Sequence, residues 1–565
     1  MIPQVIAVGA SVKPPTNVVV VEAFSSSSSS SSSSFRVAEG WNRNLSSSFA
    51  TMSTATPLKN IISRRPLRNH DQQQGKSSTI NCVSVSDKPT STSVSDDLPL
   101  KEIPGTYGLP FFGAVMDRLD FMWFQKLPNF YNARKDKYNS TVFRTNVPPG
   151  PPFFPDPRVV VVLDEKSYPI LFDMSKVWKR DVFVGTYMPS LALTGGYRTL
   201  SYLDPSEEKH TLLKNFAFHI IKSSSPRLIQ EIAAAVTDMF SPLEASITKD
   251  GKAAYGTSLQ TGTFKMVVKA YTGQDPYAQV KDTLGEGIST QVLIWLGSQI
   301  GPITPVPVPW FLAPLVEIFL HTFRVPAFIS KGTYDKLLAF FGKYGTELLD
   351  FAEKEIGLDR EEAKHNLLFL TCFNTWGGIQ IFFPDLVKRL GTTSVEYQKE
   401  LAAEVRKAVA DNGGKLTPKA LGDMPLVESV VYEVLRIDPP VPFQYAKAKE
   451  DLVIQSHDAS FQIKKGETIH GYMPVATHDP KVFVDAESFL PKRFVGEEGK
   501  ALLKYVLWSN GPQTEEPSVQ NKHCAGKNFV LLASNLFVAS FYLQYDSLQV
   551  DSTGSSLTSL KKIST

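Results

Sequence analysis

The side chain with the clearest chemical potential is the thiol of Cys524, in the segment NKHCAGK at 521–527 near the end of the chain. It has no partner cysteine in C-x-x-C spacing, and an apolar run follows it. A thiolate bound to haem iron donates electron density and favours cleavage of an O–O bond. An unpaired cysteine in a core is more often a small apolar side chain. The rest of the sequence has to decide between these two interpretations.

Three further segments could position such a thiol. The acidic capping box at 359–362 predicts the start of a long apolar helix that runs to Pro384. A second helix is predicted from about Pro425 to Arg436, and it places Glu433 and Arg436 on one face at i, i+3 spacing. The segment PKRF at 491–494 follows. Alone, each of these signals is weak, because any solvated helix can contain E-x-x-R.

Along the chain, the long helix comes first, followed by the E-x-x-R helix, the PKRF segment and the Cys524 loop. These four segments in this order resemble the haem-thiolate cytochrome P-450 superfamily. The glycine two residues after the cysteine and the basic residue two before it match the ligand loop of that family. The resemblance implies a mainly α fold with minor β structure and a single catalytic domain over 96–565. It also implies haem b with Cys524 as the axial iron ligand, and a buried charge network of Glu433, Arg436 and Arg493. That network would be structural, because an unpaired buried charge is very costly.

Two features depart from the oxygen-activating members of the superfamily. Cys524 comes thirteen residues after Gly511, where the usual loop has four, so the ligand loop carries an insertion. The long helix has FNTWGG at 373–378 in place of the acid–alcohol pair that delivers protons to dioxygen. The amide of Asn374 cannot relay a proton as a carboxylic acid can. Oxygen activation is therefore disfavoured.

Both departures resemble one plant branch of the superfamily, which metabolises fatty acid hydroperoxides and includes allene oxide synthases, hydroperoxide lyases and divinyl ether synthases. Its substrates already contain the O–O bond, so the resemblance implies an enzyme that needs neither O₂, NADPH nor a redox partner. The matching segments are GTYMPS at 185–190, TGGYR at 194–198, LDPS at 203–206, WSNGP at 508–512 and NK-x-CAGK at 521–527.

The same resemblance implies roles for four basic side chains. His210 and Lys214 are four residues apart on one predicted helix and resemble residues that hold the haem propionates. Lys179 and Lys522 match further haem-contacting positions. A cation opposite a carboxylate makes a charge-assisted hydrogen bond. Without the motifs, each lysine would be interpreted as a solvated surface residue.

Asn374 resembles the residue that aligns the hydroperoxide over the iron; the alternative is a polar residue beside a helix kink at 377–378. After O–O cleavage, the family's alkoxyl radical closes to an epoxide with a carbon-centred radical. Oxidation and proton loss then give an allene oxide and water, whereas carbon–carbon cleavage gives aldehydes. Phe183, in RDVFVG at 180–185, resembles a phenylalanine of the allene oxide synthases whose ring lies near the radical. It could instead simply line an apolar channel.

The first 95 residues differ in composition from the remainder. They contain an unbroken serine run at 25–34 and more arginine than acidic residues, which is typical of a plastid transit peptide. They hold too little apolar surface to fold alone, and a disordered tail without targeting function is the alternative. Three cysteines fit a reducing compartment, and a net charge of only +3 does not favour a nucleic-acid partner.

One later segment, 287–316, carries no charged residue, but several prolines interrupt it, so it is not a membrane span. Either it forms a surface of loops and short helices that rests on a plastid membrane, or it is an ordinary core segment.

The sequence therefore predicts a chloroplast enzyme that dehydrates a C18 fatty acid hydroperoxide, with 13-hydroperoxylinolenic acid favoured, in jasmonate and oxylipin biosynthesis. A hydroperoxide lyase or divinyl ether synthase on the same scaffold remains the nearest alternative. An oxygen-activating monooxygenase and a non-catalytic haem- or fatty-acid-binding protein are more distant ones.

Overall fold

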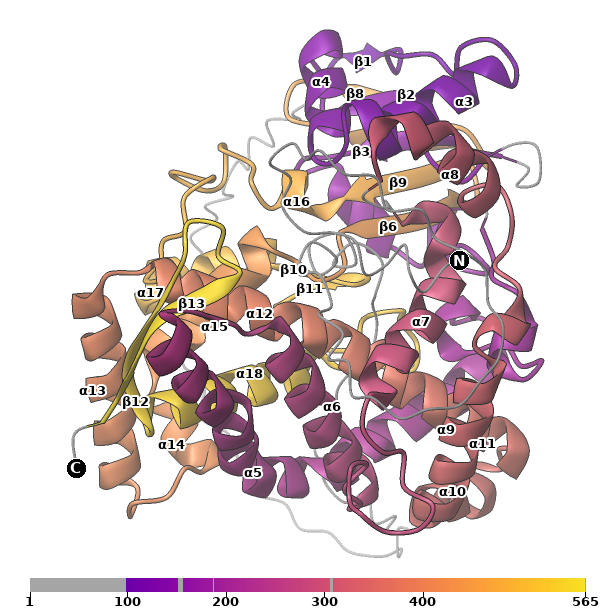
Figure 1. Ribbon diagram of the computed structural model, residues 1–565. Helices are drawn as coiled ribbons and strands as arrows, with labels where there is room; N and C mark the ends of the chain where they lie inside the picture. The colour runs from indigo at the N-terminus through magenta and orange to yellow at the C-terminus, as the bar shows by residue number, and fades with distance from the viewer. Residues whose placement is uncertain (1–97, 151–155, 186, 305–307, 564–565) are drawn as a thin grey trace, which may run out of the picture.

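The computed structural model describes residues 98–150, 156–185, 187–304 and 308–563 (Figure 1). The proposed leader, 1–95, lies outside these residues. Helices dominate the described part, and four small sheets accompany them. The helices are α3 (Phe112–Leu119), α4 (Asn129–Tyr138), α5 (Glu208–Asp250), α6 (Gly256–Thr272), α7 (Ile288–Ile300), α8 (Ala313–Leu320), α9 (Lys331–Tyr344), α10 (Thr346–Phe351), α11 (Arg360–Phe369), α12 (Gly377–Thr392), α13 (Val395–Asp411), α14 (Pro418–Gly422), α15 (Pro425–Ile437), α16 (Met473–Ala476), α17 (Gly496–Ala501) and α18 (Lys527–Tyr542).

The largest sheet has five strands in the order β2-β3-β9-β6-β4, with β3 and β9 parallel and the other pairs antiparallel. The valine run at 159–162 lies in β3 and is buried in the sheet. The strands are β1 (Leu100–Lys101), β2 (Val142–Asn146), β3 (Arg158–Val162), β4 (Val177–Trp178), β5 (Ala253–Ala254), β6 (Phe443–Ala448), β7 (Leu452–Gln455), β8 (Ser460–Ile463), β9 (Thr468–Tyr472), β10 (Leu507–Trp508), β11 (Gly511–Pro512), β12 (Tyr545–Val550) and β13 (Ser556–Lys562).

A continuous helix through the middle of the molecule is formed by α11, a π-helical turn (Leu370–Trp376) and α12 (Figure 1). It begins as predicted, because the carboxylate of Asp359 accepts the backbone N–H of Glu362 at 2.9 Å. In the described part of the chain, this is the one helix long and apolar enough to span a membrane. Most of it is buried in the protein, so we interpret it as the core helix of the fold.

The segment 287–316 divides between the two alternatives. Its first half is α7, an ordinary core helix in which Trp295 and Leu296 are fully buried. Its end, 308–316, is a surface, where a 3-10 turn (Trp310–Leu312) leads into α8 and the Trp310 side chain is 85% exposed. The core alternative therefore describes 288–300, and the alternative of a surface with a short helix describes the residues around α8.

Candidate haem site

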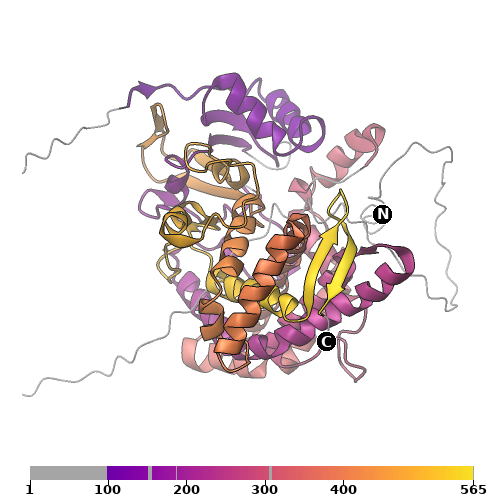
Figure 2. The ribbon, with the colours of Figure 1, turned by 90° about the vertical axis from the view of Figure 1, so that its left-hand side faces the viewer.

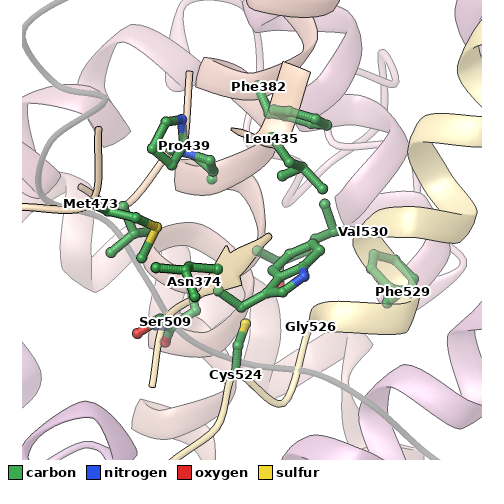
Figure 3. A pocket seen from close by; sticks show the side chains of 16 residues that line it. Asn374, Phe382, Leu435, Pro439, Met473, Ser509, Cys524, Gly526, Phe529 and Val530 are labelled. Carbon is green, nitrogen blue, oxygen red and sulfur yellow. The ribbon is translucent and has the colours of Figure 1, made fainter. Parts of the chain in front are cut away.

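The loop before α18 carries Cys524, which is only 7% exposed. Its backbone N–H donates to the carbonyl of Ser509 at 2.9 Å, and this bond ties the ligand loop to the turn between β10 and β11. The sulfur points into a pocket that Asn374, from the long helix, lines together with Cys524 (Figure 3). Most other residues of this pocket are apolar, including Leu435, Phe529 and Val530. A thiol and an amide thus share one mostly apolar pocket.

The insertion in the ligand loop is held by Lys527, a residue for which sequence reasoning assigned no role. Its buried ammonium donates to the carbonyls of Gln513 and Glu515 at 2.8 and 2.7 Å, and to Glu516 Oε1 at 2.8 Å. These three bonds use all three of its N–H groups. The signal was present in the sequence as a lysine three residues after the cysteine, but nothing there indicated that it bonds backwards to the insertion.

Gly511 has a steric reason to be glycine. A Cβ built there would fall 2.5 Å from Nδ1 of the buried His523 ring. His523 precedes Cys524, so a side chain at 511 would displace the ligand loop.

The four basic residues predicted to contact haem are buried near one another. The Lys179 ammonium donates to the carbonyl of Tyr445 at 2.7 Å. That of Lys214 donates to the carbonyls of Asn521 and His523, each at 2.7 Å. That of Lys522 donates to the carbonyls of Leu200, Ser201 and Leu203 at 2.7, 3.2 and 2.6 Å. Backbone oxygens therefore orient all three ammonium groups without neutralising them.

The charge of Lys522 lowers the pKa of the other basic residues in this group. Burial, together with the neighbouring charge of Lys522, holds the pKa values of Lys179 and Lys214 well below that of a free lysine. Burial also lowers the pKa of Lys522 to about 7, against the opposing effect of Asp204. The pKa of His210 falls to about 2, from burial and then from the charges of Lys522 and Lys214.

This cluster fits an anionic group. No carboxylate in the described part of the chain lies within ion-pair distance of Lys179, Lys214 or Lys522. Neither ring nitrogen of His210 makes a hydrogen bond of good geometry there, although the backbone of Val519 lies close to the ring. Burying unpaired cations is unfavourable. The two propionates of a haem whose iron is bound to Cys524 would supply the missing negative charge.

The π-helical turn positions Asn374, and such turns are frequent at functional sites. Its Nδ2 donates to the Ser201 hydroxyl at 3.3 Å. Among the residues that the structure describes, its Oδ1 has no hydrogen-bond partner although it is buried. The amide therefore has an acceptor available for a group that enters the pocket.

Phe183 lies beside this site. Its half-buried ring packs edge-on against Tyr202 with centroids 5.5 Å apart, and against Phe373 at 5.8 Å. Phe373 immediately precedes Asn374. Phe183 is not among the described residues that line the pocket between Cys524 and Asn374. The structure thus brings Phe183 to the helix turn that carries Asn374, but not into the pocket itself.

The predicted charge network behind the ligand is present. Glu433 is fully buried and accepts from Arg436 Nε and Nη2 at 2.7 and 2.8 Å. It also accepts from Arg493 Nε at 3.0 Å and from the backbone N–H of Leu490 at 2.9 Å. Both arginines make further bonds to backbone carbonyls. The network fixes α15 against the segment that precedes the ligand loop.

Comparisons with known proteins agree with this geometry. The family model for cytochrome P-450 matches residues 392–562. Among solved structures, retinoic acid-bound cyanobacterial CYP120A1 is similar, with a TM-score of 0.50 and 18% identity over 81% of this chain and 94% of that one. Fold and site together define a haem-thiolate enzyme of the cytochrome P-450 class.

The relatives narrow the assignment. Allene oxide synthase CYP74A2 of Parthenium argentatum is 49% identical over 80% of this chain and 94% of its own. The chloroplastic allene oxide synthase of Arabidopsis thaliana is 48% identical over 81% and 87%, respectively. The chloroplastic fatty acid hydroperoxide lyase of Solanum lycopersicum is 44% identical over 84% and 99%. The chain belongs to the allene oxide synthase family, as the sequence motifs predicted.

Proposed function

We propose that this protein is an allene oxide synthase, a hydroperoxide dehydratase that converts a C18 fatty acid hydroperoxide to an allene oxide and water. The preferred substrate in this proposal is 13-hydroperoxylinolenic acid, and the pathway is jasmonate and oxylipin biosynthesis. The observation that carries the proposal is the pairing of Cys524 with an amide, rather than a carboxylic acid, across one pocket. The identities of 49% and 48% to the Parthenium and Arabidopsis allene oxide synthases, against 44% to the tomato lyase, also support it.

The residues account for the chemistry in this way. A thiolate-ligated haem iron, when bound, cleaves the O–O bond of a hydroperoxide. Asn374 Oδ1 accepts the hydroperoxide O–H and so orients the substrate, while its amide supplies no acid to activate dioxygen. The apolar lining accommodates the fatty chain. In this proposal the substrate chain extends from the pocket past the Phe183 ring, which lies next to the turn that carries Asn374. The π face of that ring stabilises an electron-poor carbon of the substrate. All atoms of the products come from the hydroperoxide, so the reaction needs no reductase.

Haem b is the cofactor of this proposal. Lys179, His210, Lys214 and Lys522 would hold its propionates and Cys524 its iron. The sequence contains no C-x-x-C-H motif, which favours a haem held without covalent attachment.

A direct test is to incubate the purified haem-containing protein with 9- and 13-hydroperoxides under anaerobic conditions without NADPH, and to identify the products by mass spectrometry. We expect ketols and cyclic products formed from an allene oxide. Short aldehydes without ketols would identify a lyase, and a divinyl ether would identify the third activity of the branch. Dependence on O₂ and NADPH would identify a monooxygenase. Binding without O–O cleavage would leave a non-catalytic protein.

We also propose residence in the plastid, with residues 1–95 as the removed transit peptide and 96–565 as the catalytic domain. Relatives from three plants carry the description chloroplastic. Import of the full chain, but not of residues 96–565, into isolated chloroplasts is the expected result. Equal import of both forms would contradict it.

The proposed membrane contact rests on the surface that α3 and α8 share (Figures 1 and 2). A buried ion pair between Arg118 and Glu317 joins the two helices. Around this ion pair, large apolar side chains are exposed, as at membrane-binding surfaces, where aromatic residues are enriched. They are Leu109, Phe111, Phe112, Met116, Trp310, Phe311, Leu315, Ile318 and Phe319.

Co-sedimentation of residues 96–565 with lipid vesicles tests this contact. Trp310→Ser with Phe311→Ser should weaken binding while leaving hydroperoxide turnover in detergent unchanged, since both side chains are exposed. Vesicle binding equal to that of the unmodified protein would contradict the contact.

A further inference from the structure

One guanidinium, that of Arg198 in the TGGYR segment, connects three parts of the segment 181–207. Its Nε and Nη2 donate to Asp181 Oδ1 at 3.2 and 2.9 Å. Its Nη1 donates to Glu207 Oε2 at 2.6 Å, and its Nη2 also reaches the carbonyl of Tyr202 at 2.9 Å. Such multiple charge-assisted bonds from a planar fork fix orientation as well as distance.

The first of these connections controls the backbone that leads to Phe183. Asp181 has a φ of +51°, a left-handed conformation that residues other than glycine adopt at a cost. Its N–H donates to the carbonyl of Tyr202 at 3.0 Å, and the Tyr202 ring is the edge-on neighbour of Phe183. Arg198 therefore bonds both to the residue two positions before Phe183 and to the residue against which the Phe183 ring packs.

The second connection leads to the cationic cluster. Glu207 precedes α5, whose first turns carry His210 and Lys214. Its Oε1 accepts the N–H of Asp204 at 2.8 Å, and Asp204 Oδ2 in turn accepts the N–H of Lys179 at 2.6 Å. Phe183 and the residues proposed to hold the propionates are thus held in one frame by the same guanidinium.

Arg180 provides a contrast within the same loop. It also pairs with Glu207, at 3.3 Å, but its side chain is 59% exposed, against 29% for Arg198. In the described part of the chain, Arg180 has no bond to Asp181 or to the Tyr202 carbonyl. A substitution of Arg180 removes a charge from Glu207 while leaving the support of Phe183 intact.

We propose that Arg198 is a positioning residue that sets how the substrate radical divides between dehydration and carbon–carbon cleavage, by holding the Phe183 ring in place. The inference rests on the proposed allene oxide synthase function and on the role proposed for Phe183. Without the clamp, the left-handed turn at Asp181 relaxes and the ring loses its fixed distance from the substrate. Part of the flux then passes to aldehydes.

The experiment compares haem-containing Arg198→Gln, Arg198→Lys, Asp181→Asn and Arg180→Gln with the unmodified enzyme. We measure the ratio of aldehydes to dehydration products, the Soret absorbance per protein, and hydrogen–deuterium exchange of the amides at 181–204. Arg198→Gln should raise the aldehyde ratio about fivefold, equivalent to about 1 kcal/mol between the two barriers. Asp181→Asn should raise the ratio less, because its amide oxygen still accepts from Arg198 but carries no charge. Exchange at 181–204 should accelerate. Arg198→Lys should lie between, because lysine lacks the fork, and Arg180→Gln should match the unmodified enzyme.

The product ratio comes only from molecules that turn over, so partial loss of haem does not obscure it. Should Arg198→Gln bind no haem, Asp181→Asn alone decides, since it removes the charge of one connection and keeps the side-chain shape. An unchanged ratio in both variants overturns the proposal, as does an equal shift in Arg180→Gln. Adding Arg198→Gln to Phe183→Leu should change the ratio no further. An unmodified enzyme that forms only aldehydes would refute the proposed function instead, whatever the variants do.

Discussion

The substitution that tests the site most directly is Asn374→Leu. It keeps the volume of the side chain but removes the one buried acceptor, Oδ1, that has no partner among the described residues and lies in the pocket with Cys524. A buried hydrogen bond whose loss leaves a polar group unpaired is worth about 1–3 kcal/mol. If that bond forms to the hydroperoxide and persists in the transition state, kcat/KM should fall about 5- to 150-fold.

The assay follows the loss of conjugated-diene absorbance of the hydroperoxide, with rates divided by haem content from the Soret band. Asn366→Leu is the matched control. Asn366 lies in the same long helix, is buried, donates its Nδ2 to the carbonyl of Glu362 at 3.1 Å, and has an Oδ1 without a partner in the described chain. Unlike Asn374, Asn366 is not among the described residues that line the Cys524 pocket. We expect lower stability in this control but an unchanged kcat/KM per haem.

Asn374→Asp tests the hydrogen-bond acceptor separately from the volume of the side chain, because a carboxylate of similar size still accepts a hydrogen bond. It should retain more activity than Asn374→Leu. The reasoning is refuted if Asn374→Leu keeps kcat/KM within twofold of the unmodified enzyme, or if Asn366→Leu loses as much per haem.

Three other outcomes are expected. Cys524→Ser should lose the thiolate Soret signature and hydroperoxide consumption together, because a hydroxyl is not a thiolate; retention of both would exclude Cys524 as the ligand. Phe183→Leu should divert product toward aldehydes, as mass spectrometry would show, and an unchanged ratio would reduce Phe183 to an apolar packing residue. Glu433→Gln leaves two buried guanidinium groups without a full countercharge, so unfolding should become about 3–5 kcal/mol easier. A thermal midpoint equal to that of the unmodified protein would show that backbone carbonyls suffice for Arg436 and Arg493.

Much of the fold could be predicted where local signals coincide. The Asp359 cap, the strand at β3 and the Glu433–Arg436 pair on α15 all follow from spacing or from matched motifs. Burial of the three lysines could be predicted only through motif position, since lysine is ordinarily exposed. Their placement makes physical sense only with an anion that the amino-acid sequence does not contain.

What could not be predicted depends on contacts between distant segments. The bonds from Lys527 back to the insertion and from Arg198 to Asp181 and Glu207 join residues whose spacing follows no helical or strand period. The position of α7 in the core could not be predicted either, because its apolar residues suit the surface of a channel as well as the protein interior. Local sequence fixes which groups a segment offers, whereas tertiary packing decides which of them meet.

The π-helical turn at Leu370–Trp376 carries an implication for how such a site could arise or be lost. A turn closed by i→i+5 bonds holds one residue more than an α-turn, so it corresponds to a single inserted amino acid. Deleting one residue there would restore an ordinary α-helix and rotate the flanking parts of the helix by about 100° relative to each other. The amide would then turn away from the sulfur without any change to the remaining scaffold. A change of one codon would therefore separate this site from an ancestor in which another residue of the same helix faced the sulfur.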